Sequence, residues 1–196
     1  MLKINNIAIF ASGSGSNAEQ IIRYFSDDPA TRVRVVLSNN KGAFALERAR
    51  KFGVPTMAFD RHQFYQTNLV RDHLNSLEID LIVLAGFMWL IPPALLEAYP
   101  GRILNIHPAL LPAFGGKGMY GHHVHEAVIA SGVRKSGITI HLVDEVYDHG
   151  SILFQAECEV WPDDTPDALA ARIHELEHRH YPGQIKRFLQ SLDAQT

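Results

Sequence analysis

The chain has 196 residues, of which 46% are hydrophobic and 20% are charged, and its formal net charge is −3. This composition predicts a single domain over residues 1–196 and, because there is no basic block, argues against nucleic-acid binding. One cysteine, Cys158, excludes an internal disulfide and fits a reducing cytoplasm, while the polar first residues and the absence of an apolar run near roughly 18 residues argue against secretion and membrane spanning.

Short β-rich runs alternate with helical patterns along the chain, which predicts an α/β fold. Strands are expected at 7–11, 33–37, 56–59, 81–85, 103–106, 137–143 and 151–160. Helices are expected at 17–25, 43–52, 63–77, 93–99, 124–130 and 165–191. Ser16 or Asn17 is expected near the cap of the first helix, and Pro182 could interrupt the last one. The expected architecture is three-layered and Rossmann-like, a mostly parallel twisted sheet with helices on both faces.

A glycine-rich loop follows the first expected strand and leads into the first expected helix. Residues 13–18, Gly-Ser-Gly-Ser-Asn-Ala, fit the loose pattern G-x-G-x-x-G/A, in which backbone N–H groups and a helix N-terminus hold a phosphate. NAD is disfavoured because residues 38–41 offer no acidic side chain after the second strand, and NADP stays open only through Lys41. A single phosphate fits better, since Ser16 and Asn17 add donors; the alternative is a tight turn without a ligand.

The segment Asn105-Ile106-His107-Pro108 carries the strongest indication of chemistry. Asn105 and His107 are two residues apart at a strand end, so both side chains point to one face. An amide can stabilise an oxygen that becomes negative, and an imidazole can transfer a proton near neutral pH. Such a pair is more often a turn residue and a core histidine, but the acidic turn 144–150 can return a carboxylate to the histidine. Because ligands lie beyond the carboxyl ends of parallel strands, we expect this pair, residues 87–91 and the glycine loop to converge.

Together these motifs resemble the phosphoribosylglycinamide formyltransferases, the folate-dependent enzymes of purine synthesis. The motifs occur in that family's order: Gly-Ser-Gly-Ser-Asn at 13–17, Ser-Asn-Asn-Lys at 38–41, Leu-Ala-Gly-Phe-Met at 84–88, Asn-Ile-His-Pro-Ala-Leu-Leu-Pro at 105–112 and the acidic loop with Asp148. The resemblance covers nearly the whole chain. It implies transfer of the formyl group of 10-formyltetrahydrofolate, as co-substrate, to the amine of 5-phosphoribosylglycinamide. It also implies direct attack by the amine, no metal, small molecules as partners, and a monomer or weak homodimer.

The resemblance further assigns roles to residues. It implies that Asn105, His107 and Asp148 are catalytic, with Asp148 raising the pKa of His107. It implies that the ribonucleotide-binding residues are Gly15, Ser16, Asn17 and Glu177. The implied folate-binding residues are His62, Met88, Trp89, Leu90, Ile91, Asn105, Asp144, Glu145, Val146, Tyr147 and Asp148. The family often has arginine where Trp89 stands, and an arginine near position 62 that meets the folate tail. The loop 115–121, rich in glycine, is expected to be mobile.

Two further patterns are interpreted as coincidental metal motifs. Residues 174–178, His-Glu-Leu-Glu-His, match H-E-x-x-H, but Tyr181 and Gln184 stand where a further glycine and a third histidine would follow in zinc enzymes. His122, His123 and His125 have no acidic or cysteine partner at ligand spacing. We therefore expect no metal at either place.

Two alternatives to the main hypothesis stay open. Outside the class, the chain could be a noncatalytic nucleotide-binding module, which explains the glycine loop but leaves Asn105, His107 and Asp148 without a role. Within it, the chain could be another 10-formyltetrahydrofolate-dependent formyltransferase or hydrolase. Those enzymes carry further domains, which are not expected here.

Overall fold

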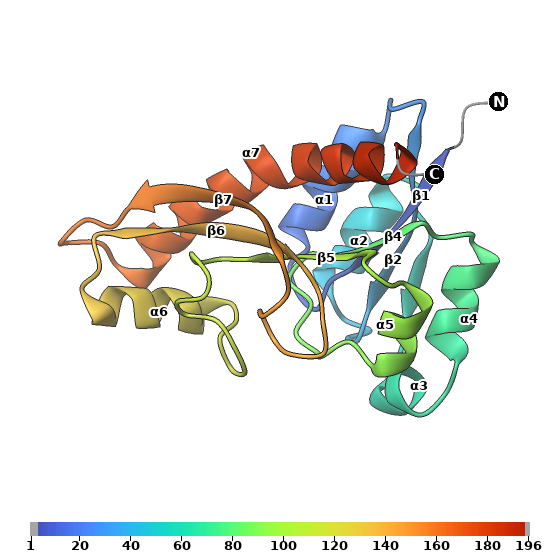
Figure 1. The fold of residues 1–196 in the computed structure, drawn as a ribbon, viewed down its shortest axis with the longest axis horizontal. Helices are drawn as coiled ribbons and strands as arrows, with labels where there is room; N and C mark the ends of the chain where they lie inside the picture. The colour runs from blue at the N-terminus through green and yellow to red at the C-terminus, as the bar shows by residue number, and fades with distance from the viewer. Residues whose placement is uncertain (1–3, 195–196) are drawn as a thin grey trace.

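The computed structural model describes residues 4–194 and contains a seven-stranded sheet (Figure 1). The strands are β1 (Asn5–Phe10), β2 (Thr31–Ser38), β3 (Thr56–Ala58), β4 (Leu81–Leu84), β5 (Ile103–His107), β6 (Lys135–Leu142) and β7 (Ile152–Glu159). The order across the sheet is β3-β2-β1-β4-β5-β6-β7; strands β1 to β5 run parallel, while β6 and β7 each pair antiparallel with the strand before them. The expected mostly parallel sheet is confirmed.

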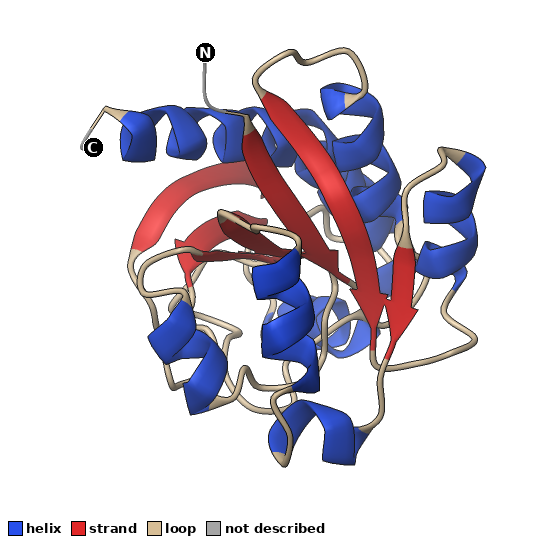
Figure 2. Ribbon diagram, turned by 90° about the vertical axis from the view of Figure 1, so that its right-hand side faces the viewer, coloured by secondary structure: helices blue, strands red, loops and turns tan. Residues whose placement is uncertain are grey.

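Helices cover both faces of this sheet, which confirms the three-layer fold (Figure 2). The helices are α1 (Ser16–Phe25), α2 (Phe44–Lys51), α3 (Arg61–Tyr65), α4 (Leu69–Ser76), α5 (Pro93–Ala98), α6 (His122–Ser131) and α7 (Pro166–Asp193). Side chains of a strand alternate between faces, so Ile7 and Ile9 join α1, α2, α6 and α7 in one core, whereas Ala8 and Phe10 join α3, α4 and α5 in the other. Each fully buried Ile or Phe side chain contributes on the order of 1.5–3 kcal/mol.

The last helix, α7, packs against both the parallel and the antiparallel part of the sheet. It runs along the top of the molecule and packs on α1, α6 and the strands from β5 to β7 (Figure 1). Tyr181 on this helix is fully buried, and its hydroxyl donates toward the carbonyl oxygens of Leu84, at 2.9 Å, and Leu104, at 3.3 Å. The helix continues through Pro182, so the interruption considered from the sequence does not occur.

One local expectation was wrong. The expected helix 63–77 is two helices, α3 and α4, because Thr67 hydrogen-bonds locally: its hydroxyl donates to the Gln63 carbonyl and accepts from the Leu69 N–H.

Ser16 and Asn17 are the first two residues of α1 and so lie next to its cap, as expected. The cap itself is Gly15, in a left-handed conformation with φ 71°, and no side chain caps the helix.

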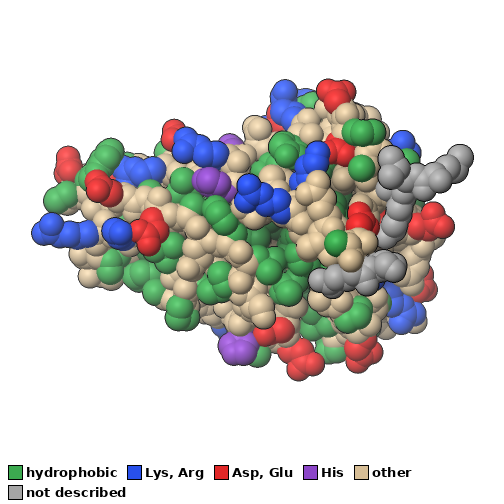
Figure 3. Space-filling model, turned by 45° about the horizontal axis from the view of Figure 1, so that its top comes forward, with side chains coloured by type: hydrophobic (Ala, Val, Ile, Leu, Met, Phe, Trp, Pro, Cys, Tyr) green, Lys and Arg blue, Asp and Glu red, His purple; other side chains and the backbone are tan. Residues whose placement is uncertain are grey.

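The surface in Figure 3 carries acidic and basic side chains interspersed, and no basic patch extends across the face shown. Among the helices of residues 4–194, none is long and apolar enough to cross a bilayer.

Candidate active site

A cleft of about 700 Å³ lies beyond the carboxyl ends of β1, β4 and β5. The order of the strands reverses between β1 and β4, and such a reversal is where an open α/β sheet holds ligands. The cleft is lined by the expected residues Gly15, Ser16, Asn17, Met88, Trp89, Leu90, Ile91, Asn105, His107, Val146, Tyr147, Asp148 and Glu177. The convergence expected from topology is therefore what the structure shows.

Three residues expected to bind folate do not line this cleft. His62 lies on α3 in a separate depression of about 500 Å³, together with Arg61, Tyr65 and Gln66. Asp144 turns its carboxylate to the Val146 N–H, at 2.9 Å, and to the Nδ1 atom of His149, at 2.8 Å. Glu145 is exposed on the same turn. Of the three carboxylates in the acidic turn, Asp148 alone lines the cleft.

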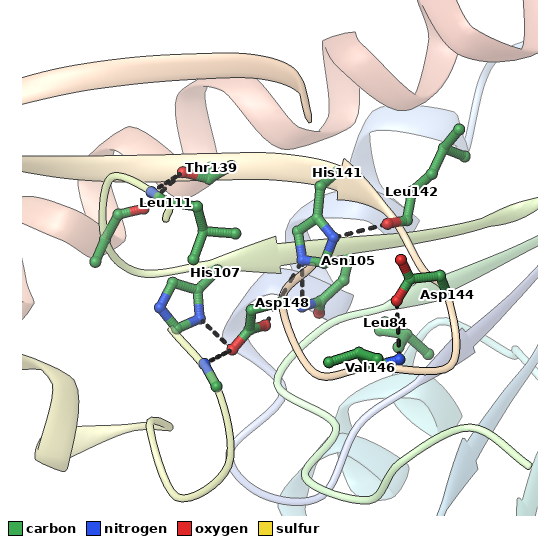
Figure 4. A network of polar contacts seen from close by, with 12 residues as sticks. Leu84, Asn105, His107, Leu111, Thr139, His141, Leu142, Asp144, Val146 and Asp148 are labelled. Carbon is green, nitrogen blue, oxygen red and sulfur yellow. Dashed lines mark hydrogen bonds and ion pairs between the residues drawn. The ribbon is translucent and has the colours of Figure 1, made fainter. Parts of the chain in front are cut away.

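Asn105, His107 and Asp148 come together at the end of β5 (Figure 4). Asp148 follows β6 in a left-handed conformation with φ 55°, and its side chain is 10% exposed. Its Oδ2 atom lies 3.4 Å from the Nδ1 atom of His107 and accepts a hydrogen bond from the Gly116 N–H at 3.0 Å. Burial raises the pKa of Asp148, but His141, His107 and the Gly116 N–H outweigh it, so the pKa is lowered and the carboxylate stays ionised.

The two nitrogens of His107 both face oxygen acceptors. Nδ1 faces Asp148, and Nε2 lies 2.8 Å from the carbonyl oxygen of Phe114. A neutral imidazole has one N–H, so only the imidazolium can donate to both oxygens. Burial nevertheless lowers the pKa of His107, and the carboxylate of Asp148 offsets this only in part. Asp148 acts on the His107 pKa in the expected direction, but the net pKa is lowered rather than raised, because the desolvation of a buried imidazole outweighs its carboxylate partner.

His141 is a site residue that the sequence did not reveal. It lies opposite Asn105 in the pairing of β5 with β6. Its Nδ1 atom donates to the Leu142 carbonyl at 2.8 Å, and its Nε2 atom lies 3.1 Å from Asn105 Nδ2 and 3.7 Å from Asp148 Oδ1. His141 thus contacts two of the three expected catalytic side chains and holds the Asn105 amide at the cleft wall. The alternation Thr139-Ile140-His141, which mirrors Asn105-Ile106-His107, was the signal available.

The loop of residues 113–121, between β5 and α6, packs against His107 and Asp148. The Phe114 carbonyl faces His107, and the Gly116 N–H binds Asp148, so the loop backbone bonds to two of the three expected catalytic side chains. A Cβ atom at Gly115 would lie 2.5 Å from Leu111 Cδ2 and 3.2 Å from Asp148 Cβ. Glycine is thus required there for the loop to approach Asp148 this closely.

At the other end of the cleft, Glu177 is a buried carboxylate with two donors. Asn17 Nδ2 donates to its Oε2 atom at 2.8 Å, and His174 Nδ1 lies 2.9 Å from the same atom. The contact with Glu177 raises the pKa of His174, which is the response expected of a cation beside a carboxylate. Asn17 Oδ1 is buried and has no partner among the described residues. This wall therefore presents hydrogen-bonding groups next to the first turn of α1.

Trp89 belongs to an aromatic cluster beside the cleft. Its ring contacts Phe59, Phe64, Tyr65 and Phe87 at centroid distances between 5.9 and 6.4 Å. The guanidinium of Arg61 lies 5.8 Å from the Trp89 ring centroid, in a cation–π contact. Arg61 thus brings a cation from α3 to the Trp89 ring.

His125 on α6 is 3% exposed, and burial together with neighbouring His174 lowers its pKa to about 4. In the unfolded chain a histidine has a pKa of about 6.5, so as the pH falls the unfolded state binds a proton at this residue before the folded state does. The contribution of His125 to the free energy of unfolding is therefore fully present above about pH 6.5 and is lost as the pH falls toward 4. We expect the free energy of unfolding to lose roughly 2 to 3 kcal/mol from this residue between pH 7 and about pH 4.5. Urea unfolding at both pH values should show that His125→Gln loses less free energy of unfolding in acid than the unmodified chain does, by that amount.

The matched control for this measurement is His123→Gln, since the His123 side chain on the same helix is 64% exposed. It should lose as much stability in acid as the unmodified chain. An identical acid loss in all three proteins would show that His125 is not held neutral by the fold.

Comparison with known proteins decides the family. The family model described as formyl transferase matches residues 5–185. The chain belongs to the formyl transferase family. The chain is 38% identical over 191 residues to a Bacillus subtilis protein named phosphoribosylglycinamide formyltransferase, covering 95% of each chain. Its fold matches a solved phosphoribosylglycinamide formyltransferase from Streptococcus pneumoniae TIGR4 with a TM-score of 0.84 and 40% identity, over 95% of this chain and 99% of that one.

Plant relatives are longer. A chloroplastic phosphoribosylglycinamide formyltransferase from Arabidopsis thaliana is 45% identical over 182 residues, which are 89% of this chain and 62% of the relative. The chain spans 58% of a second such plant protein, from Vigna unguiculata. The chain thus covers less than two thirds of these two plant proteins but nearly the whole length of the bacterial ones.

Proposed function

We propose that this formyl transferase moves the formyl group of 10-formyltetrahydrofolate to the amine of 5-phosphoribosylglycinamide, giving N-formylglycinamide ribonucleotide and tetrahydrofolate. One observation carries the proposal: Asp148, His107 and Asn105 meet in the same cleft as the glycine loop. A noncatalytic nucleotide-binding module would not need this arrangement. The relatives described above, which carry the name of the same activity, support it.

The ribonucleotide is proposed to bind at the glycine-loop end of the cleft. The first turn of α1 leaves backbone N–H groups without partners inside the helix, and these suit a phosphate. Asn17 and Glu177 then face the ribose hydroxyls. The folate is proposed to lie along residues 88–91 and 146–148, so that its formyl carbon and the glycine amine meet beside Asn105 and His107.

The proposed reaction is direct attack of the amine on the formyl carbon, which makes a tetrahedral intermediate with a negative oxygen. Asn105 donates an amide N–H to this oxygen, and His107 donates from Nε2 once the substrate displaces the Phe114 carbonyl. An oxyanion donor of this kind is worth about 10²- to 10³-fold in rate. The proton lost by the amine reaches the departing folate nitrogen through His107 or ordered water, while Asp148 balances the imidazolium charge.

An activity assay on the purified chain tests the proposal. Both substrates are supplied, and the formylated ribonucleotide is detected by mass spectrometry alongside release of tetrahydrofolate. Formylated product in the complete mixture and none without the ribonucleotide is the expected result. Release of tetrahydrofolate without a formylated acceptor would instead point to the hydrolase alternative, and no turnover at all would sink the proposal.

Catalysis is expected to be independent of zinc. His174 and His178 stack with ring planes 17° apart, and no cluster of three or more metal-ligating side chains exists among residues 4–194. Dialysis against a strong chelator should leave the rate unchanged to within about twofold, since proton transfer and hydrogen bonding alone are proposed for the chemistry. Loss of activity that only zinc restores would contradict this interpretation of residues 174–178.

We further infer that the protein acts in the cytoplasm on small molecules rather than nucleic acid, as a monomer or weak homodimer. The single cysteine supports the cytoplasm, the net charge of −3 argues against nucleic acid, and the oligomeric state rests on the resemblance alone. Sedimentation of the purified chain over a range of concentrations tests the oligomeric state. The same measurement with and without a short RNA tests nucleic-acid binding.

A further inference from the structure

The glycine loop rests on α2 and α1 through its carbonyl oxygens. The Gly13 carbonyl accepts from the Ala45 N–H at 3.1 Å, and the Gly15 carbonyl accepts from the Glu19 N–H at 2.9 Å. The carbonyl between them, that of Ser14, accepts from the Nε atom of Arg48 at 2.9 Å. Three successive carbonyls are thus engaged outside the cleft, and only the middle one depends on a side chain.

A trans peptide unit is planar, so its C=O and the next N–H point in opposite directions. Holding the Ser14 carbonyl against Arg48 therefore fixes the N–H of Gly15 on the opposite side. The neighbouring carbonyls fix the N–H groups of Ser14 and Ser16 in the same way. The three hydrogen bonds to the loop carbonyls thus fix the direction of the amides proposed to receive the phosphate.

Arg48 is itself held in place on two sides. Its guanidinium pairs with Glu19, which also binds Arg23 at 2.7 Å, and hydrogen bonds from Arg23 and Arg48 lower the pKa of Glu19. The guanidinium also lies 4.7 Å from the centroid of the Phe44 ring. The side chain is 29% exposed and is absent from the cleft wall, so it acts on the loop and not on a ligand directly.

We propose that Arg48 is the positioning residue of the phosphate site: by binding the Ser14 carbonyl, it orients the loop amides toward the substrate phosphate. This inference rests on the proposed function, because it takes the glycine loop as the phosphate-binding element. It predicts a defect confined to substrates that carry the phosphate.

The test compares Arg48→Met with Arg50→Met, a control at an exposed arginine of the same helix. Methionine keeps an apolar stem over Phe44 but cannot donate to Ser14. We expect Arg48→Met to raise the Michaelis constant for 5-phosphoribosylglycinamide about 5- to 10-fold, the scale of one lost hydrogen bond to a carbonyl that orients the site. The turnover number and the Michaelis constant for the folate should stay within about twofold, as should all constants of Arg50→Met.

A phosphate-free substrate separates this role from a merely structural one. The kcat/KM for the corresponding glycinamide ribonucleoside should be the same in Arg48→Met and in the unmodified chain. Equal losses for both substrates, or no loss for either, would overturn the inference. If Arg48→Met fails to fold, Arg48→Lys serves in its place, with a smaller but still phosphate-specific defect.

Failure of the proposed function is recognised separately. If the unmodified chain formylates neither substrate, calorimetry with ribose 5-phosphate replaces the kinetic assay. Weaker binding by Arg48→Met than by Arg50→Met would still support the positioning role. Equal binding by the two variants would overturn it.

Discussion

Replacing His107 with asparagine is expected to lower the turnover number about 10²-fold or more, the scale of a lost general acid–base group and oxyanion donor. The imidazole has Asp148 at Nδ1, and its Nε2 atom is the one proposed to face the reacting groups once the Phe114 carbonyl is displaced. Asparagine cannot relay a proton. Asparagine is smaller and polar, so the fold should survive, with a melting temperature within a few degrees. Steady-state rates with both substrates saturating measure the effect.

The control is His62→Asn. The sequence places His62 among the folate-binding residues, but the structure places it on α3 outside the cleft. Its turnover number and folate Michaelis constant should both be close to normal. Near-normal turnover in His107→Asn would return His107 to the role of a buried core histidine. A large folate defect in His62→Asn would show that the depression around α3 belongs to the folate site.

Gly15→Val is expected to raise the Michaelis constant for the ribonucleotide about 10²-fold, because more than one hydrogen bond to a charged phosphate is lost. Gly15 has φ 71°, and any Cβ atom there would lie 2.4 Å from the Cβ of Ala45. The side chain must therefore push the loop away from α2, which moves the amides. Calorimetry on the folded variant should find folate binding nearly unchanged, since residues 88–91 and 146–148 lie elsewhere in the cleft.

Gly183→Ala is the control, because a Cβ atom at Gly183 also meets nothing within 4 Å and this residue does not line the cleft. It should bind both ligands normally. Equal loss of both ligands in Gly15→Val would mean that the two sites are not divided along the cleft as proposed. Loss of folate binding alone would reverse the assignment and give the glycine loop a cofactor role.

The elements that the sequence predicted well are those fixed by local pattern. Asn105 and His107 share a face because strand side chains alternate, and the strand ends converge because parallel strands all end at one edge. The division of residues 63–77 into two helices was not predicted, although its causes are local in the sequence. Asp60 and Gln63 form a capping box that starts α3 at Arg61, and Thr67 provides the break.

What the sequence could not predict depends on three-dimensional surroundings. The net shift of the His107 pKa follows from how deeply the imidazole is buried, which no spacing reveals. Which carboxylate of the acidic turn enters the cleft follows from the backbone: Asp148 adopts φ 55°, while Asp144 is used to cap the turn. His141 was missed because its partner Asn105 is adjacent only through strand pairing.

The hydrogen bond from Asn17 to Glu177 joins residues 160 positions apart. A nascent chain leaves the ribosome from its N-terminus, so the glycine loop emerges long before α7 can supply Glu177 and the Tyr181 anchor. At the proposed ribonucleotide wall, the contact between Asn17 and Glu177 can therefore form only after α7 has been made, whereas the proposed folate wall, within 88–148, lies earlier in the chain. A ligand that contacts both Asn17 and Glu177 stabilises only the finished molecule, by about 2.7 kcal/mol at a hundred times its Kd. On the proposed assignment, the phosphorylated substrate would thus draw newly made chains into their final form.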